Sequence, residues 1–182
     1  MALHPYSVPD SYTNKIVFLD RDGILNEEIG DYVYELDAFV IPPGVPEALR
    51  ALKAAGYRLV VVTNQGGLDK GIYTRAQMAA CHAKLEAAAP GLIDHIYYSP
   101  HHKTVTRSQL SKPLSLMLER GMHRYQARPQ DCFLVGDAAR DLEAAAAVGI
   151  RGILVPTLKE REHPLAVHIA QDLAAASSWI LA

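Results

Sequence analysis

The sequence predicts an α/β fold built on a doubly wound parallel sheet. Apolar runs of strand length within residues 16–19, 57–63 and 132–137 each lead into acidic or polar residues. Segments with helical periodicity separate these runs, and such alternation is typical of a parallel sheet with helices on both faces. The chain contains no internal repeat and no low-complexity linker. We therefore expect residues 1–182 to form a single domain, with residues 1–14 as a lead-in.

The composition excludes several classes of protein. Apolar residues make up 49% of the 182 residues, charged residues 21%, and the formal net charge is -2. This balance provides no basic surface for nucleic acid or for a membrane. No apolar stretch is long enough to span a bilayer, and the lead-in lacks the features of a signal peptide. Cys81 and Cys132 lie far apart in apolar settings and are expected to be inert core thiols. We expect a cytoplasmic monomer.

The first predicted strand, residues 16–19, ends in Asp20-Arg21-Asp22-Gly23. Two carboxylates at the carboxyl end of a buried strand either form a ligand site or belong to an ordinary Asp-Gly turn. The following segment, residues 21–45, is too long for a tight turn and is expected to fold over the ends of the strands.

The remaining elements follow from periodicity, capping residues and helix stops. Helices are predicted over residues 46–55, 74–89, 112–121, 138–148 and 165–181. Strands are predicted over residues 57–63, 94–99, 132–137 and 151–156. The loop 100–111 is polar.

The polar groups that follow the strands suit one reaction, because the carboxyl ends of the strands converge on one crevice. A carboxylate attacks phosphorus, a neighbouring acid moves the proton, and a hydroxyl and a lysine hold the phosphate oxygens. Several carboxylates facing an anion require a divalent cation such as Mg²⁺ between them. The pattern predicts phosphoryl transfer. The candidate residues are Asp20, Asp22, Thr63, Asn64, Gln65, Lys112, Asp137 and Asp141.

Four motifs carry a family resemblance. Asp-Arg-Asp-Gly-Ile at Asp20, Val-Val-Thr-Asn at Thr63, Ser-Lys-Pro at Lys112 and Gly-Asp-Ala-Ala-Arg-Asp at Asp137 resemble those of the haloacid dehalogenase-like phosphatases. The resemblance implies a Rossmann-like fold without a large cap domain, and a small phosphate ester as substrate.

The resemblance also implies a role for each candidate. Asp20 would be the nucleophile and Asp22 the general acid and base. Lys112 would steady the phosphate and the nucleophile, while Thr63, Asn64 and Gln65 would bind the phosphate or the rest of the substrate. The Mg²⁺ ligands would be Asp20, the backbone carbonyl of Asp22 and Asp137, with Asp141 in support.

Further matches indicate one branch of the family. The segments at residues 18–26, 60–67 and 96–102 resemble the D-glycero-D-manno-heptose-1,7-bisphosphate 7-phosphatases and the related histidinol-phosphate phosphatases. Those enzymes commonly bind zinc through three cysteines and a histidine. Here Ser99 replaces the first cysteine, the segment 107–111 has none, and His101 with His102 cannot complete a four-ligand site. We therefore expect no zinc.

Two cations of that branch are also missing. Ser111 replaces an arginine before the lysine motif, and Ala138 replaces a lysine after Asp137. Lys70, Lys103 and Arg107 are possible substitutes, although each is more simply a solvated loop charge. A sugar phosphate such as the heptose 1,7-bisphosphate is the expected substrate, with histidinol phosphate as the alternative. Other hypotheses are a nucleic-acid 3′-phosphate, which the charge disfavours, a signalling receiver domain and a non-catalytic phosphate-binding protein.

Overall fold

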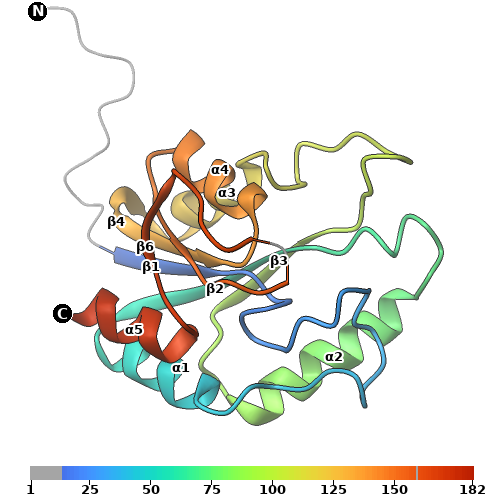
Figure 1. Ribbon diagram of the computed structural model, residues 1–182, viewed down its shortest axis with the longest axis horizontal. Helices are drawn as coiled ribbons and strands as arrows, with labels where there is room; N and C mark the ends of the chain where they lie inside the picture. The colour runs from blue at the N-terminus through green and yellow to red at the C-terminus, as the bar shows by residue number, and fades with distance from the viewer. Residues whose placement is uncertain (1–13, 159) are drawn as a thin grey trace, which may run out of the picture.

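The structure is a computed structural model that describes residues 14–158 and 160–182, and its described part contains a six-stranded parallel sheet (Figure 1). The strands are β1 Asn14–Leu19, β2 Tyr57–Asn64, β3 His95–Ser99, β4 Ala127–Gly136, β5 Arg151–Leu154 and β6 Ala166–Ile169. Their order across the sheet is β3-β2-β1-β4-β5-β6. The chain thus winds outward from β1 in one direction and then from β4 in the other, which confirms the predicted doubly wound sheet. Most of the predicted lead-in lies outside the described residues.

Helices cover both faces of the sheet (Figure 1). They are α1 Val45–Ala54, α2 Arg75–Ala88, α3 Leu116–Tyr125, α4 Ala139–Ala147 and α5 Leu173–Leu181. Alternate residues of a strand point to opposite faces. Val17 and Leu19 therefore pack in one core with α1, α2 and α5, whereas Ile16 and Phe18 pack in a second core with α3 and α4. Strands buried on both faces explain the continuous apolar runs of the sequence.

Two sequence predictions about the helices were wrong. Residues 165–181 do not form one closing helix, because Ala166–Ile169 pairs with β5 as the edge strand β6 and α5 begins only after Asp172, whose carboxylate caps its first turn. The third predicted helix begins at Leu116 rather than at Lys112 and continues past Gly121 to Tyr125. Gly121 does not stop this helix: its missing side chain makes room for the ring of Phe18 beneath it.

The carboxyl ends of β1 and β4 define the place where a ligand site is expected. They are neighbours at the point where the winding of the sheet reverses, and such switch points carry the ligand crevice of doubly wound folds. Segments 20–44 and 100–115, which follow β1 and β3, contain no helix or strand among the described residues and gather at this end of the sheet (Figure 1). Neither segment forms a large cap domain, as predicted.

The loop after β1, residues 20–44, is anchored to the core by buried side chains and by a hydrogen bond. Val33 and Phe39 are buried in the core below it. The guanidinium of Arg21 donates a 2.8 Å hydrogen bond to the carbonyl of Val33. The loop therefore has a fixed path past the strand ends.

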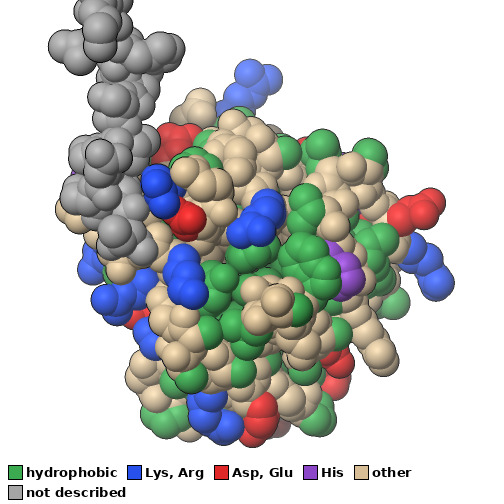
Figure 2. Space-filling view, turned by 90° about the vertical axis from the view of Figure 1, so that its left-hand side faces the viewer, with side chains coloured by type: hydrophobic (Ala, Val, Ile, Leu, Met, Phe, Trp, Pro, Cys, Tyr) green, Lys and Arg blue, Asp and Glu red, His purple; other side chains and the backbone are tan. Residues whose placement is uncertain are grey.

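The opposite side of the molecule, at the β6 edge, exposes apolar side chains. Figure 2 shows hydrophobic side chains gathered on that face. Val167 and Ile169 of β6 and Trp179 of α5 are among the exposed apolar residues, and the ring of His168 stacks on that of Trp179. Among the described residues, no helix is long and apolar enough to cross a membrane.

Candidate active site

Every residue proposed from the sequence lies at the carboxyl end of the sheet. Asp20 and Asp137 directly follow β1 and β4, Asp141 lies in the first turn of α4, and Thr63 is the penultimate residue of β2. A crevice of about 520 Å³ opens here, and its walls include Asp22, Asn64 and Lys112. The structure thus brings together residues that are 121 positions apart in the chain at the extremes, from Asp20 to Asp141.

Lys112 links two buried carboxylates at the floor of the crevice. Its Nζ lies 2.9 Å from Asp20 Oδ1 and 2.5 Å from Asp141 Oδ1, and it donates a 2.7 Å hydrogen bond to the carbonyl of Val62. Burial opposes ionisation of Asp20, but the charges of Lys112 and Arg140 and the hydrogen bonds to Oδ1 outweigh it and lower the pKa of Asp20. Asp20 is therefore held as a carboxylate. No described residue donates a hydrogen bond to its Oδ2.

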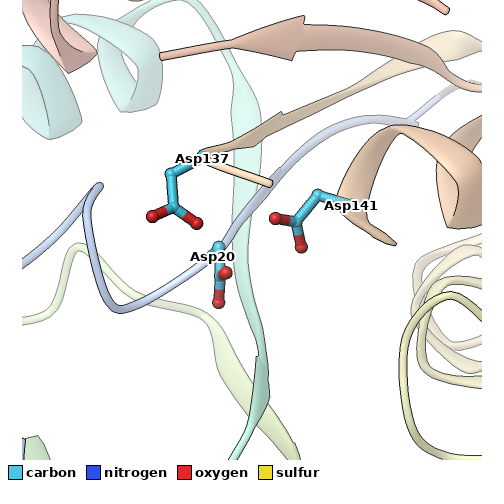
Figure 3. A group of neighbouring side chains, drawn as sticks. All are labelled: Asp20, Asp137 and Asp141. Atoms are coloured by element: carbon cyan, nitrogen blue, oxygen red, sulfur yellow. The ribbon is translucent and has the colours of Figure 1, made fainter. Parts of the chain in front are cut away.

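Three buried carboxylates form a potential cation site. Oxygen atoms of Asp20, Asp137 and Asp141 lie within 4.8 Å of one another, and Figure 3 shows the three side chains as close neighbours at the strand ends. Burial and the charge of Asp20 raise the pKa of Asp141 to about 6. Close carboxylate oxygens are the hard ligands that Mg²⁺ prefers, so the donor set fits this ion. The side chain of Asp22 is not part of this group.

Glycines allow the backbone to approach these carboxylates. Gly23 has φ +88°, and a Cβ at this position would lie 2.5 Å from Asp137 Oδ2. A Cβ at Gly136 would collide with the side chain of Asp141. Asp137 also accepts a 2.9 Å hydrogen bond from the hydroxyl of Thr157. The Asp-Gly and Gly-Asp pairs of the sequence are thus required by close packing around the acids.

Asp22 contributes to the wall of the crevice. Its Oδ1 accepts hydrogen bonds from Arg21 Nε at 3.0 Å, Arg21 Nη2 at 2.8 Å and Asn26 Nδ2 at 3.0 Å. Its Oδ2 accepts a longer one, 3.4 Å, from Gln65 Nε2. Since Oδ1 is saturated, Oδ2 is the oxygen that is available to exchange a proton.

The side chain of Gln65 is buried and links three other side chains of the site. Its Nε2 donates a 2.9 Å hydrogen bond to Thr63 Oγ1, and its Oε1 accepts a 2.6 Å hydrogen bond from the hydroxyl of Tyr73. The sequence analysis did not identify Tyr73, because nothing in the local pattern shows that the loop after β2 folds this ring back beneath Gly67.

The side chain of Asn64 anchors the backbone of Lys112 through two hydrogen bonds. Its Nδ2 donates a 2.9 Å hydrogen bond to the carbonyl of Lys112, and its Oδ1 accepts a 3.0 Å hydrogen bond from the Lys112 amide. Both groups of the side-chain amide therefore have protein partners. The geometry explains why asparagine suits this position: one planar amide satisfies the backbone donor and acceptor of a residue on a distant loop.

The outer part of the crevice contains several cationic or titratable groups. His101, His102, Lys103 and Arg140 contribute to its walls. Of the substitutes considered from the sequence, Lys103 lies here, whereas Lys70 packs over the ring of Tyr32. Arg140 was missed, although its position between the two acids of one motif was a signal that could have identified it.

The loop from Ser99 to Ser111 is closed by hydroxyl groups. Ser99 Oγ and Ser111 Oγ lie 2.7 Å apart, and Ser111 Oγ also donates a 3.4 Å hydrogen bond to the carbonyl of His101. The amide of His102 donates to Asp69 Oδ2 at 3.2 Å. These contacts join the two ends of the loop at the position where the sequence lacks the cysteines of the branch it resembles.

Comparisons with known proteins agree with this geometry. A family model described as haloacid dehalogenase-like hydrolase matches residues 11–149. The chain is 37% identical over 169 residues to a D-glycero-beta-D-manno-heptose-1,7-bisphosphate 7-phosphatase of Pseudomonas putida, covering 88% of this chain and 96% of that protein. A protein of the same description from Neisseria meningitidis is 34% identical over 163 residues, with coverage of 85% and 87%. The solved structure of D,D-heptose 1,7-bisphosphate phosphatase from B. bronchiseptica, complexed with magnesium and phosphate, superposes with a TM-score of 0.84 and 32% identity, covering 92% and 98%.

Proposed function

The chain belongs to the haloacid dehalogenase-like hydrolase family, and from this membership we propose that it is a Mg²⁺-dependent phosphatase that removes the 7-phosphate of D-glycero-β-D-manno-heptose 1,7-bisphosphate. The observation that carries the proposal is the buried Asp20 carboxylate, paired with Lys112 and adjoining two further acids, in a chain whose relatives act on this sugar.

Asp20 is the proposed nucleophile. One oxygen of its ionised carboxylate attacks phosphorus, the bond from phosphorus to the sugar oxygen breaks, and an aspartyl-phosphate forms. The lowered pKa of Asp20 keeps the attacking group deprotonated. Lys112 holds Oδ1, and Oδ2 has no hydrogen-bond partner among the described residues, so Oδ2 is the proposed attacking oxygen. A lysine at this distance also offsets negative charge on the phosphoryl oxygens.

Asp22 is the proposed proton carrier. Its Oδ2 gives a proton to the departing sugar oxygen and later takes one from the water that attacks the aspartyl-phosphate, which regenerates Asp20 and releases inorganic phosphate. The three hydrogen bonds to Oδ1 keep the carboxyl oriented through both steps. Thr63 is proposed to bind the transferred phosphate, beside the Gln65 amide that orients its hydroxyl.

Asp20 and Asp137 are proposed to hold Mg²⁺, together with Asp141 or with the Asp22 carbonyl. The ion would supply charge neutralisation between the acids and the phosphate dianion. A magnesium complex of a protein 32% identical to this chain supports that assignment.

We further propose that the loop 99–111 keeps its shape without zinc. The Ser99–Ser111 hydroxyl pair and the backbone contact to Asp69 provide the closure that a metal would otherwise supply. Metal analysis of the purified protein is expected to find no stoichiometric zinc, and one zinc per chain would overturn this proposal.

A substrate panel tests the proposed function. The heptose 1,7-bisphosphate, hexose mono- and bisphosphates, histidinol phosphate and nucleotides are each assayed for released phosphate with Mg²⁺ present. We expect the heptose bisphosphate to have the highest kcat/KM, with loss of the 7-phosphate alone. Preference for histidinol phosphate would support the related branch, and no release from any ester would refute a phosphatase.

A single domain and a monomeric state remain predictions, which size-exclusion chromatography with light scattering would test.

A further inference from the structure

Arg140 extends into the same crevice from the first turn of α4, beside the proposed nucleophile. Its Nη2 lies 3.9 Å from Asp20 Oδ2, which is the oxygen that accepts no hydrogen bond from the described residues. The side chain is 36% exposed, and Arg140 contributes to the crevice wall together with Asp22 and Lys112. The guanidinium therefore lies at the place where a phosphoryl group must arrive to be attacked.

The guanidinium of Arg140 makes no hydrogen bond to another described residue. Its Nε is buried without a hydrogen-bond partner among the described residues, and the 3.9 Å separation from Asp20 is too long for a hydrogen bond. By contrast, the other arginine of the site, Arg21, donates to Asp22 and to the carbonyl of Val33. A buried hydrogen-bond donor without a partner destabilises the protein by its lost hydration, and a ligand that accepts its hydrogen bond removes this penalty. Arg140 thus retains donors for a bound anion.

The chemistry of the guanidinium favours a phosphate as that anion. Burial disfavours the charged form of Arg140, but the carboxylates of Asp20, Asp141, Asp137 and Asp22 raise its pKa and keep it charged. Lys112 is already occupied by Asp20 and Asp141. The planar fork of arginine matches two oxygens of one phosphate, which a lysine does not.

We propose that Arg140 binds the phosphoryl group that is transferred to Asp20, as a second cation of the phosphate site beside Lys112. A phosphorus atom in contact with Asp20 Oδ2 carries its oxygens within hydrogen-bond reach of a guanidinium that lies 3.9 Å from the same oxygen. This inference rests on the proposed function and names a phosphate-binding residue at the same site. It also places the missing cation of the sequence at 140, two positions after Ala138, in the first turn of α4.

Two other roles make different predictions. If Arg140 only neutralises the acids in the absence of a metal, its removal strengthens Mg²⁺ binding and leaves phosphate binding unchanged. If Arg140 instead binds a second phosphate that is not transferred, its removal lowers kcat/KM for bisphosphates and leaves kcat/KM for monophosphates unchanged. Binding of the transferred group requires equal losses for both kinds of substrate.

The experiment compares Arg140→Ala, Arg140→Lys and a matched control, Arg50→Ala, whose side chain is exposed and paired with Glu47 on α1. Binding of inorganic phosphate to each full-length protein with Mg²⁺ is measured by calorimetry, and kcat/KM is measured for a sugar monophosphate and a bisphosphate. We expect Arg140→Ala to weaken phosphate binding about 10-fold and to lower kcat/KM about 100-fold for both substrates, with partial recovery in Arg140→Lys. Thermal unfolding verifies that each variant is folded, and Arg140→Gln replaces the alanine variant if that one is not.

Three results would overturn the inference: unchanged phosphate binding in Arg140→Ala, a loss confined to the bisphosphate, or an equal loss in Arg50→Ala. The calorimetric measurement also separates this inference from the proposed function. A wild-type protein that binds phosphate through Arg140 but hydrolyses no ester would contradict the phosphatase proposal alone.

Discussion

The hydroxyl of Tyr73 donates a 2.6 Å hydrogen bond to Gln65 Oε1, and this contact fixes which way the buried Gln65 amide points. Its Nε2 then faces Thr63 Oγ1 at 2.9 Å and Asp22 Oδ2 at 3.4 Å. The reversed amide would direct a carbonyl oxygen at the Asp22 carboxylate. Burial raises the pKa of Tyr73, so the hydroxyl stays protonated and remains a donor throughout the neutral range.

Tyr73→Phe is therefore expected to disturb catalysis without unfolding the protein. Loss of the hydroxyl releases the Gln65 amide, which then no longer has a fixed contact with Oδ2 of Asp22, the proposed proton carrier, so kcat should fall about 10-fold while KM changes less. The control is Tyr34→Phe, because Tyr34 stacks on Tyr73 at 5.2 Å and the substitution keeps the ring. Equal kcat values in the wild type and Tyr73→Phe would contradict the role of this contact; the pH profile of kcat/KM should shift only in Tyr73→Phe.

Asp20→Asn should abolish phosphate release. An amide is a poor nucleophile and also loses the ion pair with Lys112, so kcat should drop at least about 1,000-fold. The matched control is Asp37→Asn, which makes the same change on an exposed loop residue. Trapping the phosphorylated wild type by rapid acid quench and locating the label at Asp20 would verify the intermediate. Retained turnover in Asp20→Asn would rule out this nucleophile.

Chelation of divalent cations should inactivate the enzyme reversibly. Removal of divalent cations by EDTA leaves the carboxylates of Asp20, Asp137 and Asp141 facing the phosphate dianion, which they repel. We expect activity to disappear with EDTA and to return when Mg²⁺ is added in excess. Asp137→Asn should need a higher Mg²⁺ concentration for half-maximal activity. Full activity in EDTA would show that the acidic cluster serves another purpose.

The sequence was sufficient for five of the six strands and for the place of the candidate site, but not for the edge strand β6 or for the contacts within the site. Buried parallel strands leave continuous apolar runs, and each run ends at the crevice, so position made Asp20 and Asp137 candidates. The polar groups that follow the other strands then favoured a site over an ordinary turn. β6 was missed because a four-residue edge strand, with Val167 and Ile169 exposed, resembles one side of an amphipathic helix. The partner of Tyr73 depends on the path of a loop, which no local pattern encodes.

The half-buried imidazole of His82 should make stability depend on pH. Burial, with the charge of Arg21, lowers its pKa from 6.5 to about 4, and its Nε2 has no hydrogen-bond partner among the described residues. Between these two values the unfolded chain binds the proton and the folded chain does not, so stability falls as the pH drops from 6.5 toward 4. We expect His82→Leu to reduce that fall by about 2 kcal/mol.

The measurement is the free energy of unfolding in urea at several pH values between 4 and 7. The same substitution at His123, which is exposed on α3, is the control. An identical pH dependence in wild type and His82→Leu would contradict the assignment.

Gly121→Ala should destabilise the protein although it lies inside a helix. Helix propensity alone favours alanine by about 1 kcal/mol. However, the new Cβ would collide with Cε1 of Phe18 and lie 2.8 Å from its Cζ, in a core formed by β1 and α3. Overpacking of this kind costs about 1–3 kcal/mol, which exceeds the gain in propensity. Phe18→Leu removes the obstructing ring atoms, so in that background the same glycine substitution should become neutral or stabilising. Urea denaturation of the two single variants and the double variant measures the coupling free energy between the two positions. If Gly121→Ala lowers the free energy of unfolding equally in both backgrounds, the ring of Phe18 is not what requires glycine at this position.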